Sequence, residues 1–232
     1  MPCNAVTPSL ALSLVPALVL ALGLTPAWAD EANLSANSSG SAGTATRLVI
    51  AQRAYLHALE QGEVFTLVAA IRLARSVTLR PATAWQKTAA DTEADDAPVR
   101  TPDPASPAAL TIAQNLAGED PDLQDLVYDL DAQIPRSRLE TAVTTTGTLA
   151  PGQTDSWRIV LFGEVPAELA LIGDGKSPLG LTMTDEGGST VCTAPASRGP
   201  VLCRLTPARN GFFNLAILNP GEVPASYRLI GN

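Results

Sequence analysis

From Gly147 to the end of the chain, apolar and polar residues alternate with a period of two. The alternating runs lie at 157–161, 179–183, 201–205, 213–217 and 227–229. Turn-forming residues such as Pro151-Gly152 and Asn219-Pro220-Gly221 separate them. Successive side chains of a strand point to opposite faces of a sheet, so this pattern is typical of strands with one buried face. Several short strands at this spacing predict an antiparallel β-sandwich over residues 144–232.

Upstream of this region, apolar residues recur at steps of three and four, which indicates amphipathic helices. One stripe runs through 48–59 and a second through 64–74, and we expect Pro81 to end the second helix. Ser-Pro at 106–107 and Asp-Pro at 120–121 are start signals for two more helices. We therefore predict an α+β chain with two modules, in which about four antiparallel helices over residues 47–143 precede the sandwich. The helices fit a plain four-helix bundle or a pair of hairpins of the tetratricopeptide type.

The segment 83–105 differs from both modules. It contains four closely spaced acids, Asp91, Glu93, Asp95 and Asp96, followed by several prolines. Such a composition predicts a mobile linker. Its acidic run would suit a basic partner, although acidic runs in linkers are more often simply solvated.

The first 29 residues have the pattern of a signal peptide. An uncharged apolar run from Ser9 to Leu24 precedes Ala27-Trp28-Ala29, which fits the small-x-small rule of a signal-peptidase site. We expect a mature chain that begins at Asp30, with a flexible leader over 30–46 and no membrane span after cleavage. The alternative is an uncleaved anchor, which Pro16 and Pro26 disfavour because they interrupt the run. Export predicts a periplasmic or secreted protein.

Removal of the signal peptide leaves two cysteines, Cys192 and Cys203. Cysteines of exported proteins usually pair, because the periplasm and the extracellular space are oxidising. We expect a disulfide between them, on neighbouring strands of one hairpin. Two buried free thiols are the alternative, and a metal site is disfavoured because no second Cys or His pair accompanies them.

The alternating region resembles a known family. The residues that carry the resemblance are Gly147-Thr148-Leu149, Gly152-x-x-Asp155-x-Trp157-x-Ile159, Leu179-x-Leu181-x-Met183-x-Asp185-x-x-Gly188, Gly211-x-Phe213-x-Leu215-x-Ile217 and Tyr227-x-Leu229. Together they are similar to the bacterial pre-peptidase C-terminal (PPC) domain, a small jelly-roll-like sandwich appended to secreted proteins. The resemblance implies an accessory module. The upstream part is too small and too poor in catalytic residues to be the protease that such a domain accompanies.

Candidate catalytic residues are few. His57 is the only histidine, and its place at the edge of a helical stripe favours a structural or surface role. Gly175-Lys176-Ser177 is similar to the end of a phosphate-binding loop, but Ala170 replaces the required glycine and Pro178 follows where a helix should begin. No Gly-x-Ser-x-Gly or His-Glu-x-x-His motif occurs.

Four acids near predicted turns, Asp155, Asp174, Asp185 and Glu186, are candidate calcium ligands. They are scattered along the sequence, which favours turn-forming and solvated roles instead. We therefore predict no catalytic, cofactor-binding or metal-binding residues.

The chain of 232 residues has a formal net charge of −8, which argues against a nucleic-acid partner because phosphate binding needs a basic face. These observations favour an exported, non-enzymatic binding or structural protein, whose sandwich contacts an unknown protein or envelope component. The alternatives are an accessory or chaperone-like subunit of a secreted enzyme and, third, a hydrolase with an unrecognised site. Nothing in the sequence indicates the oligomeric state.

Overall fold

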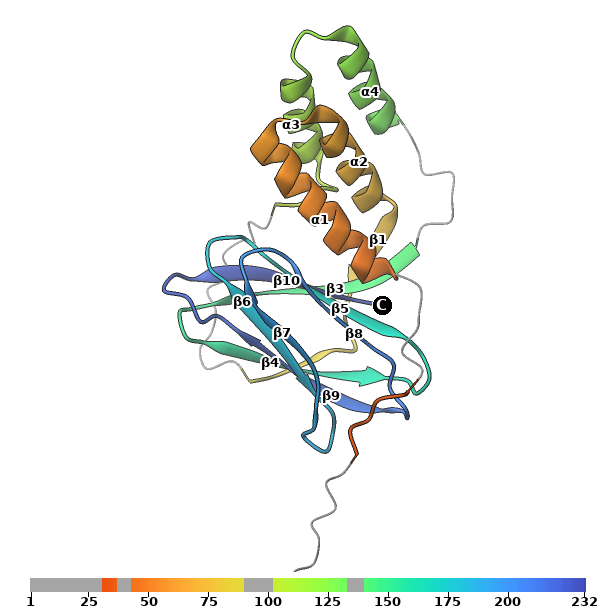
Figure 1. Ribbon diagram of the computed structural model, residues 1–232, viewed down its shortest axis with the longest axis vertical. Helices are drawn as coiled ribbons and strands as arrows, with labels where there is room; N and C mark the ends of the chain where they lie inside the picture. Colours follow the sequence, from red (N-terminus) through yellow and green to blue (C-terminus); the bar gives the residue numbers. More distant parts are fainter. Residues whose placement is uncertain (1–30, 37–42, 90–101, 133–139) are drawn as a thin grey trace, which may run out of the picture.

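The computed structural model describes residues 31–36, 43–89, 102–132 and 140–232. Within these ranges the chain forms four helices and ten strands, which confirms the α+β class. Figure 1 shows the helices gathered at one end of the molecule, beside two five-stranded sheets. The helices are α1 (Thr44–Gln61), α2 (Val64–Arg75), α3 (Pro107–Ala117) and α4 (Pro121–Ala132).

The two sheets have interleaved connections. Sheet A has the strand order β1 (Val77–Pro81), β3 (Glu140–Leu149), β10 (Ala225–Gly231), β5 (Ala167–Gly173) and β8 (Val201–Leu205). Sheet B has the order β2 (Gln86–Ala89), β4 (Thr154–Leu161), β9 (Gly211–Leu218), β6 (Leu179–Thr184) and β7 (Thr190–Ser197). Neighbouring strands are antiparallel, except that β1 runs parallel to β3.

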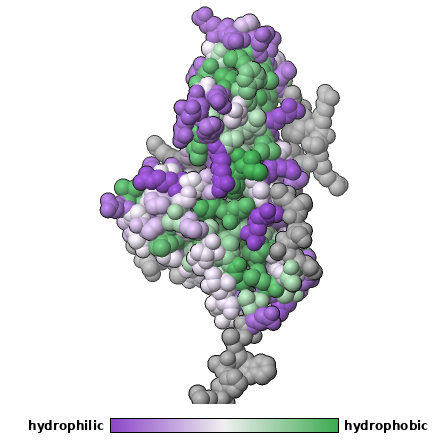
Figure 2. Space-filling model, viewed as in Figure 1, coloured by the Kyte–Doolittle hydropathy of each residue, from purple (hydrophilic) through white to green (hydrophobic). Residues whose placement is uncertain are grey.

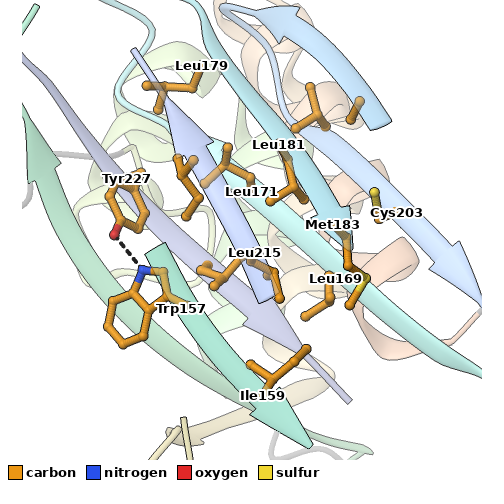
Figure 3. Packing of buried hydrophobic residues seen from close by; sticks show 14 of the residues in the cluster. Trp157, Ile159, Leu169, Leu171, Leu179, Leu181, Met183, Cys203, Leu215 and Tyr227 are labelled. Carbon is orange, nitrogen blue, oxygen red and sulfur yellow. Dashed lines mark hydrogen bonds between the residues drawn. The ribbon is translucent and has the colours of Figure 1, made fainter. Parts of the chain in front are cut away.

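One apolar core lies between the two sheets (Figure 3). Sheet A contributes buried side chains that include Leu169, Leu171 and Tyr227, and sheet B contributes others that include Met183 and Leu215. Met183, Leu215 and Tyr227 lie in strands that the period-two pattern predicted, and their side chains occupy alternate positions there. Burial of large apolar side chains between the sheets is therefore a main source of stability.

Helix α1 covers the outer side of sheet A. Leu48 and Val49 of α1 pack with Ala170, Ile172 and Ile230 of the sheet in a second apolar cluster. Strand β5 is consequently buried on both faces, with Leu169 in the core between the sheets and Ala170 beneath α1. A strand buried on both faces loses its alternation, which explains why the sequence pattern did not predict β5.

The helices have an apolar core of their own. It includes Tyr55, Leu67, Ile71, Ala113 and Val127 and thus draws on all four helices. Two of the helix starts follow the predicted chemistry. The hydroxyl of Ser106 accepts a hydrogen bond from the N–H of Ala109 at 3.3 Å, and Asp120 Oδ1 accepts one from the N–H of Leu123 at 3.2 Å.

Residues 77–89 differ from the expected helix end and linker. Helix α2 ends at Arg75, before Pro81, and the chain then forms β1 and β2. Strand β1 extends the edge of sheet A and β2 extends the edge of sheet B. Pro81 fits there because an edge strand tolerates a residue that cannot donate a backbone hydrogen bond. The module boundary near 143 therefore does not separate the two sheets from the upstream chain.

Residues 31–36 differ from the expected flexible leader. Asn33 is fully buried. Its backbone N–H donates to Asp185 Oδ2 at 2.8 Å, and its side-chain Nδ2 donates to the carbonyl of Arg209 at 3.1 Å. The N–H of Ser35 also donates to the carbonyl of Thr206 at 2.8 Å. This short polar segment therefore lies against loops of sheets A and B and is held there by hydrogen bonds. The sequence did not predict this order because the segment has no apolar pattern.

Candidate functional site

The outer side of sheet B carries exposed apolar side chains. Val160 on β4 and Phe212 on β9 are cross-strand partners and are 46% and 43% exposed. The guanidinium of Arg158 stacks over the ring of Phe212, 3.9 Å from its centroid. Leu218, at the other end of β9, is also exposed. We call this surface, formed by the outward residues of β4, β9 and β6, the outer face of sheet B.

Among the residues that the structure describes, no helix packs on this face. Helix α1 contacts β3, β5, β8 and β10, and α2 contacts β1, all of them in sheet A. The two sheets thus differ in their outer sides, since α1 packs on the outer side of sheet A and no described helix packs on that of sheet B. Exposed apolar side chains that neighbour one another are characteristic of interaction surfaces.

A hydrogen-bond network of polar side chains crosses the core beneath this face. Tyr227 donates its hydroxyl proton to Asp155 Oδ2 at 2.5 Å and accepts a hydrogen bond from Trp157 Nε1 at 2.9 Å, the bond drawn in Figure 3. Lys87 of β2 pairs with the same Asp155 oxygen at 2.9 Å. Burial and the Asp155 carboxylate both raise the pKa of Tyr227. Because each polar group has a partner and Asp155, Trp157 and Tyr227 are buried, this network stabilises the fold.

This hydrogen-bond network also explains why the sequence has a glycine at position 147. A side-chain carbon at Gly147 would lie 2.5 Å from the hydroxyl of Tyr227, closer than non-bonded atoms approach. Only glycine leaves the space that the buried tyrosine occupies. Gly147, Asp155, Trp157 and Tyr227 therefore form one packing unit.

Glu168 of β5 holds the start of α1. Its carboxylate accepts hydrogen bonds from the backbone N–H groups of Gly43 and Thr46, at 2.9 and 2.8 Å, and from the hydroxyl of Thr46 at 2.7 Å. Arg204 Nε lies 3.1 Å from the same carboxylate. Burial opposes ionisation of Glu168, but these hydrogen bonds and Arg204 outweigh it and hold its pKa below the usual value. A strand residue thus caps the helix that covers its own sheet.

A small cavity lies where the helices meet sheet A, and we call it the junction pocket. It has a volume of about 30 Å³. Its walls come from α1, α2, β1, β5, β10 and the segment 103–105, with Leu48, Val77, Ile172 and Ile230 among the apolar residues. Gln52 of α1 also lines it. In the space-filling view, apolar side chains run along the helices and continue onto the sheets (Figure 2).

The polar groups at this pocket are unequally satisfied. Arg228 Nη1 lies 3.1 Å from Asp103 Oδ2, and Asp103 Oδ1 accepts a hydrogen bond from the N–H of Ala105 at 2.9 Å. Gln52 is only 3% exposed, yet its side-chain amide has no hydrogen-bond partner among the described residues. Buried polar groups are nearly always hydrogen-bonded, so an unpaired amide beside a cavity calls for an explanation.

The candidate calcium ligands do not come together. Asp155 belongs to the hydrogen-bond network of Tyr227, whereas Asp174 accepts hydrogen bonds from the N–H groups of Ser226 and Lys176. Asp185 accepts them from Asn33 and Ser189. Burial opposes ionisation of Asp185, but hydrogen bonds from backbone N–H groups outweigh it and lower its pKa.

Within the described ranges, no three His, Cys, Asp or Glu side chains are grouped so that they would hold a metal ion. Glu186 pairs with Arg209 at 3.6 Å instead of joining the other acids. The acidic run 91–96 lies outside the described residues, and so does the signal-peptide prediction.

The remaining candidates have structural positions. His57 is exposed on α1. Gly175-Lys176-Ser177 lies in the turn between β5 and β6, where the hydroxyl of Ser177 donates to Asn219 Oδ1 at 2.7 Å. A phosphate-binding loop would instead lead into a helix.

Cys192 and Cys203 form the predicted disulfide, with a Cα–Cα distance of 6.0 Å. The expected hairpin is wrong, however. Cys192 lies on β7, which pairs with β6, and Cys203 lies on β8, which pairs with β5. The bond therefore joins the edge of sheet B to the edge of sheet A. At the opposite edges, β1 and β2 are consecutive in the chain and link the same two sheets.

Comparison with protein-family models and with curated proteins finds no match to this chain. No helix in the described part of the chain is long and apolar enough to cross a membrane.

Proposed function

We propose that this protein is an exported, non-enzymatic binding protein of the bacterial envelope or extracellular space. In this proposal its two sheets form a jelly-roll-like sandwich of the PPC type, and the outer face of sheet B is the contact surface. The observation that carries the proposal is the asymmetry between the sheets, since α1 covers sheet A while Val160 and Phe212 are exposed on sheet B.

The composition of the outer face of sheet B supports this role. Among the outward residues of β4, β9 and β6, Arg158 carries the only charge. The whole chain has a formal net charge of −8, so a surface without carboxylates differs from the average of the protein. Depletion of charged residues with retention of aromatic residues and arginine is characteristic of the centre of protein interfaces.

The pair Arg158–Phe212 has the properties of a binding anchor. Stacking of the guanidinium on the ring restricts both side chains before any partner arrives. Side chains that are ordered in advance lose less conformational entropy on binding. Aromatic residues and arginine also dominate the energetics of many interfaces.

A second candidate function rests on the helices. Phe65 of α2 and Tyr128 of α4 are each 72% exposed, so the helical part also presents large apolar side chains. An accessory or chaperone-like subunit would dock on its enzyme through these residues. In that case the sheets would serve as a scaffold.

Site-specific photo-crosslinking in the native host separates the two functions. A photoreactive amino acid would replace Phe212 or Val160 on sheet B, and Phe65 or Tyr128 on the helices. We expect cross-links to one envelope or extracellular species from the sheet positions. Cross-links from the helix positions alone would favour the accessory subunit, and an absence of cross-links from all four would contradict both functions.

A further inference from the structure

The junction pocket is lined by one amide, that of Gln52, which the described chain does not satisfy. Gln52 lines the pocket with 3% of its surface exposed, and its amide has two N–H donors and one carbonyl acceptor without a described partner. Tyr55 lies three residues further along α1, outside the pocket lining, and is also 3% exposed, with no hydrogen bond from its hydroxyl to a described residue. Leaving such groups unpaired in the interior costs free energy that a bound molecule would recover.

The charges at the pocket cancel. Asp103 and Arg228 both line it and form an ion pair with each other at 3.1 Å. Burial and, to a smaller extent, the carboxylate of Asp103 raise the pKa of the nearby Tyr55 hydroxyl on α1. A net-neutral site gives no advantage to a charged ligand, which would lose hydration without gaining an opposite charge.

The remaining walls and the size restrict the ligand further. Leu48, Val77, Ile172 and Ile230 give the pocket apolar walls. A volume of about 30 Å³ accommodates roughly two or three water molecules or a polar group of similar size. A suitable ligand therefore fills this volume with a small neutral polar end, and a short apolar stem outside it can contact the edges of the apolar walls.

We propose that the junction pocket binds a primary carboxamide on a short aliphatic stem, with Gln52 as its recognition residue. The ligand N–H donates to Gln52 Oε1, and Gln52 Nε2 donates to the ligand carbonyl, so that the two amides pair reciprocally. The second ligand N–H donates to the carboxylate of Asp103. The stem packs against the apolar walls.

This site is independent of the outer face of sheet B. It lies between the helices and sheet A, a position where ligand sites are frequent because two parts of a protein meet there. A bound carboxamide would contact α1, the segment 103–105 and sheet A at once, so binding would stabilise the docking of the helices.

The test is a titration of the isotope-labelled protein with propionamide, followed by NMR of the side-chain amide signals. We expect a saturable shift of the Gln52 signals with a dissociation constant on the order of 1 mM, since so small a ligand makes few contacts. N,N-dimethylacetamide has no N–H donor and sodium propionate is charged, so both should bind at least about 10-fold more weakly. Equal binding of all three compounds, or no saturable shift with propionamide, would overturn the proposal and leave ordered water as the content of the pocket.

Two substitutions at position 52 complete the test. Gln52→Met keeps the length of the side chain and removes its hydrogen bonds, so it should abolish the propionamide response without lowering the melting temperature. Gln52→Glu keeps the shape but lacks the N–H donors, and it serves if the methionine variant does not fold. The control is Gln61→Leu, at the exposed end of α1, which should bind propionamide as the unchanged protein does. Retained binding in a folded position-52 variant would overturn the proposal.

Discussion

Glu168 and Thr46 lie 122 positions apart in the chain, yet the Glu168 carboxylate accepts hydrogen bonds from both the backbone N–H and the hydroxyl of Thr46. The first belongs to β5 and the second to the first turn of α1. An interior strand of sheet A thus provides the N-terminal cap of the helix that covers this sheet. The orientation of α1 on the sheet is fixed by polar contacts as well as by the apolar cluster.

Replacement of Glu168 with glutamine should lower the free energy of unfolding by about 1–3 kcal/mol, because it removes charge-assisted hydrogen bonds from a buried position. Urea unfolding followed by circular dichroism measures this change. Glu222→Gln, on an exposed loop, is the matched control and should change the free energy of unfolding by less than about 0.5 kcal/mol.

The difference in unfolding free energy between the unchanged protein and Glu168→Gln should depend on pH. The folded state lowers the pKa of Glu168, so the carboxylate contributes stability above the pKa of an unfolded glutamate, about 4.3. This contribution is lost as the pH falls through the lower pKa of the folded state. The difference in stability between the unchanged protein and Glu168→Gln should therefore narrow below about pH 4. A constant difference between neutral and acidic pH would contradict the assignment.

The strands that were predicted from sequence have one buried and one outward side. Trp157 and Ile159 on β4 and Phe213 on β9 face the core and alternate with outward residues, and this alternation is visible in the sequence. Strand β5 has no such alternation because its two faces enter different clusters. Strand β2 is short and polar, so it has no alternating pattern, and it forms by pairing with β4.

The candidate sites were harder to predict for a related reason. The two cysteines could be paired from the sequence because they are the only cysteines after Cys3, but their strands belong to different sheets. Gln52 lies on the helical face that also carries Leu48 and Tyr55, where a sequence pattern gives no sign that an amide is buried. The exposure of Phe212 depends on which sheet α1 covers, and that is a property of the tertiary structure alone.

Tyr227→Phe should destabilise the protein by about 1–3 kcal/mol. The change removes the hydroxyl that joins Asp155 to Trp157 and leaves the indole N–H without its acceptor in the core. Thermal and urea unfolding measure the effect. Tyr128→Phe removes the same atom from a side chain that is 72% exposed, and it should leave stability nearly unchanged. Equal effects of the two substitutions would show that the buried hydrogen bonds contribute nothing.

A fragment of residues 144–232 should not unfold cooperatively like the intact protein. It lacks β1 and β2, which form the edges of the two sheets, and it leaves the buried Asp155 without Lys87. An unpaired buried charge and two unprotected strand edges favour aggregation or a loosely packed state. Circular dichroism and thermal unfolding of the fragment decide the question. A sharp transition at the temperature of the intact protein would show that the upstream strands are dispensable.

Joint replacement of Cys192 and Cys203 by alanine should lower the free energy of unfolding by about 2–4 kcal/mol. The bond joins the edges of the two sheets, and β7 and β8 pair with different neighbours. Urea unfolding of this variant and of Thr193→Ala, an exposed control on β7, provides the comparison. Identical stability of the double variant and the control would show that the disulfide between the two sheet edges does not stabilise the protein.

In our proposal the outer face of sheet B binds the partner, and two matched double variants test this binding most directly. One replaces Val160 and Phe212 with serine, and the other replaces Phe65 and Tyr128 with serine, so each removes two exposed apolar side chains. The measurement is the amount of the species cross-linked through Phe212 that each folded variant retains on affinity purification from the native host, determined by quantitative mass spectrometry. We expect the sheet variant to lose at least about 10-fold of it and the helix variant to retain it. Full retention by the sheet variant, with loss in the helix variant, would contradict the claim.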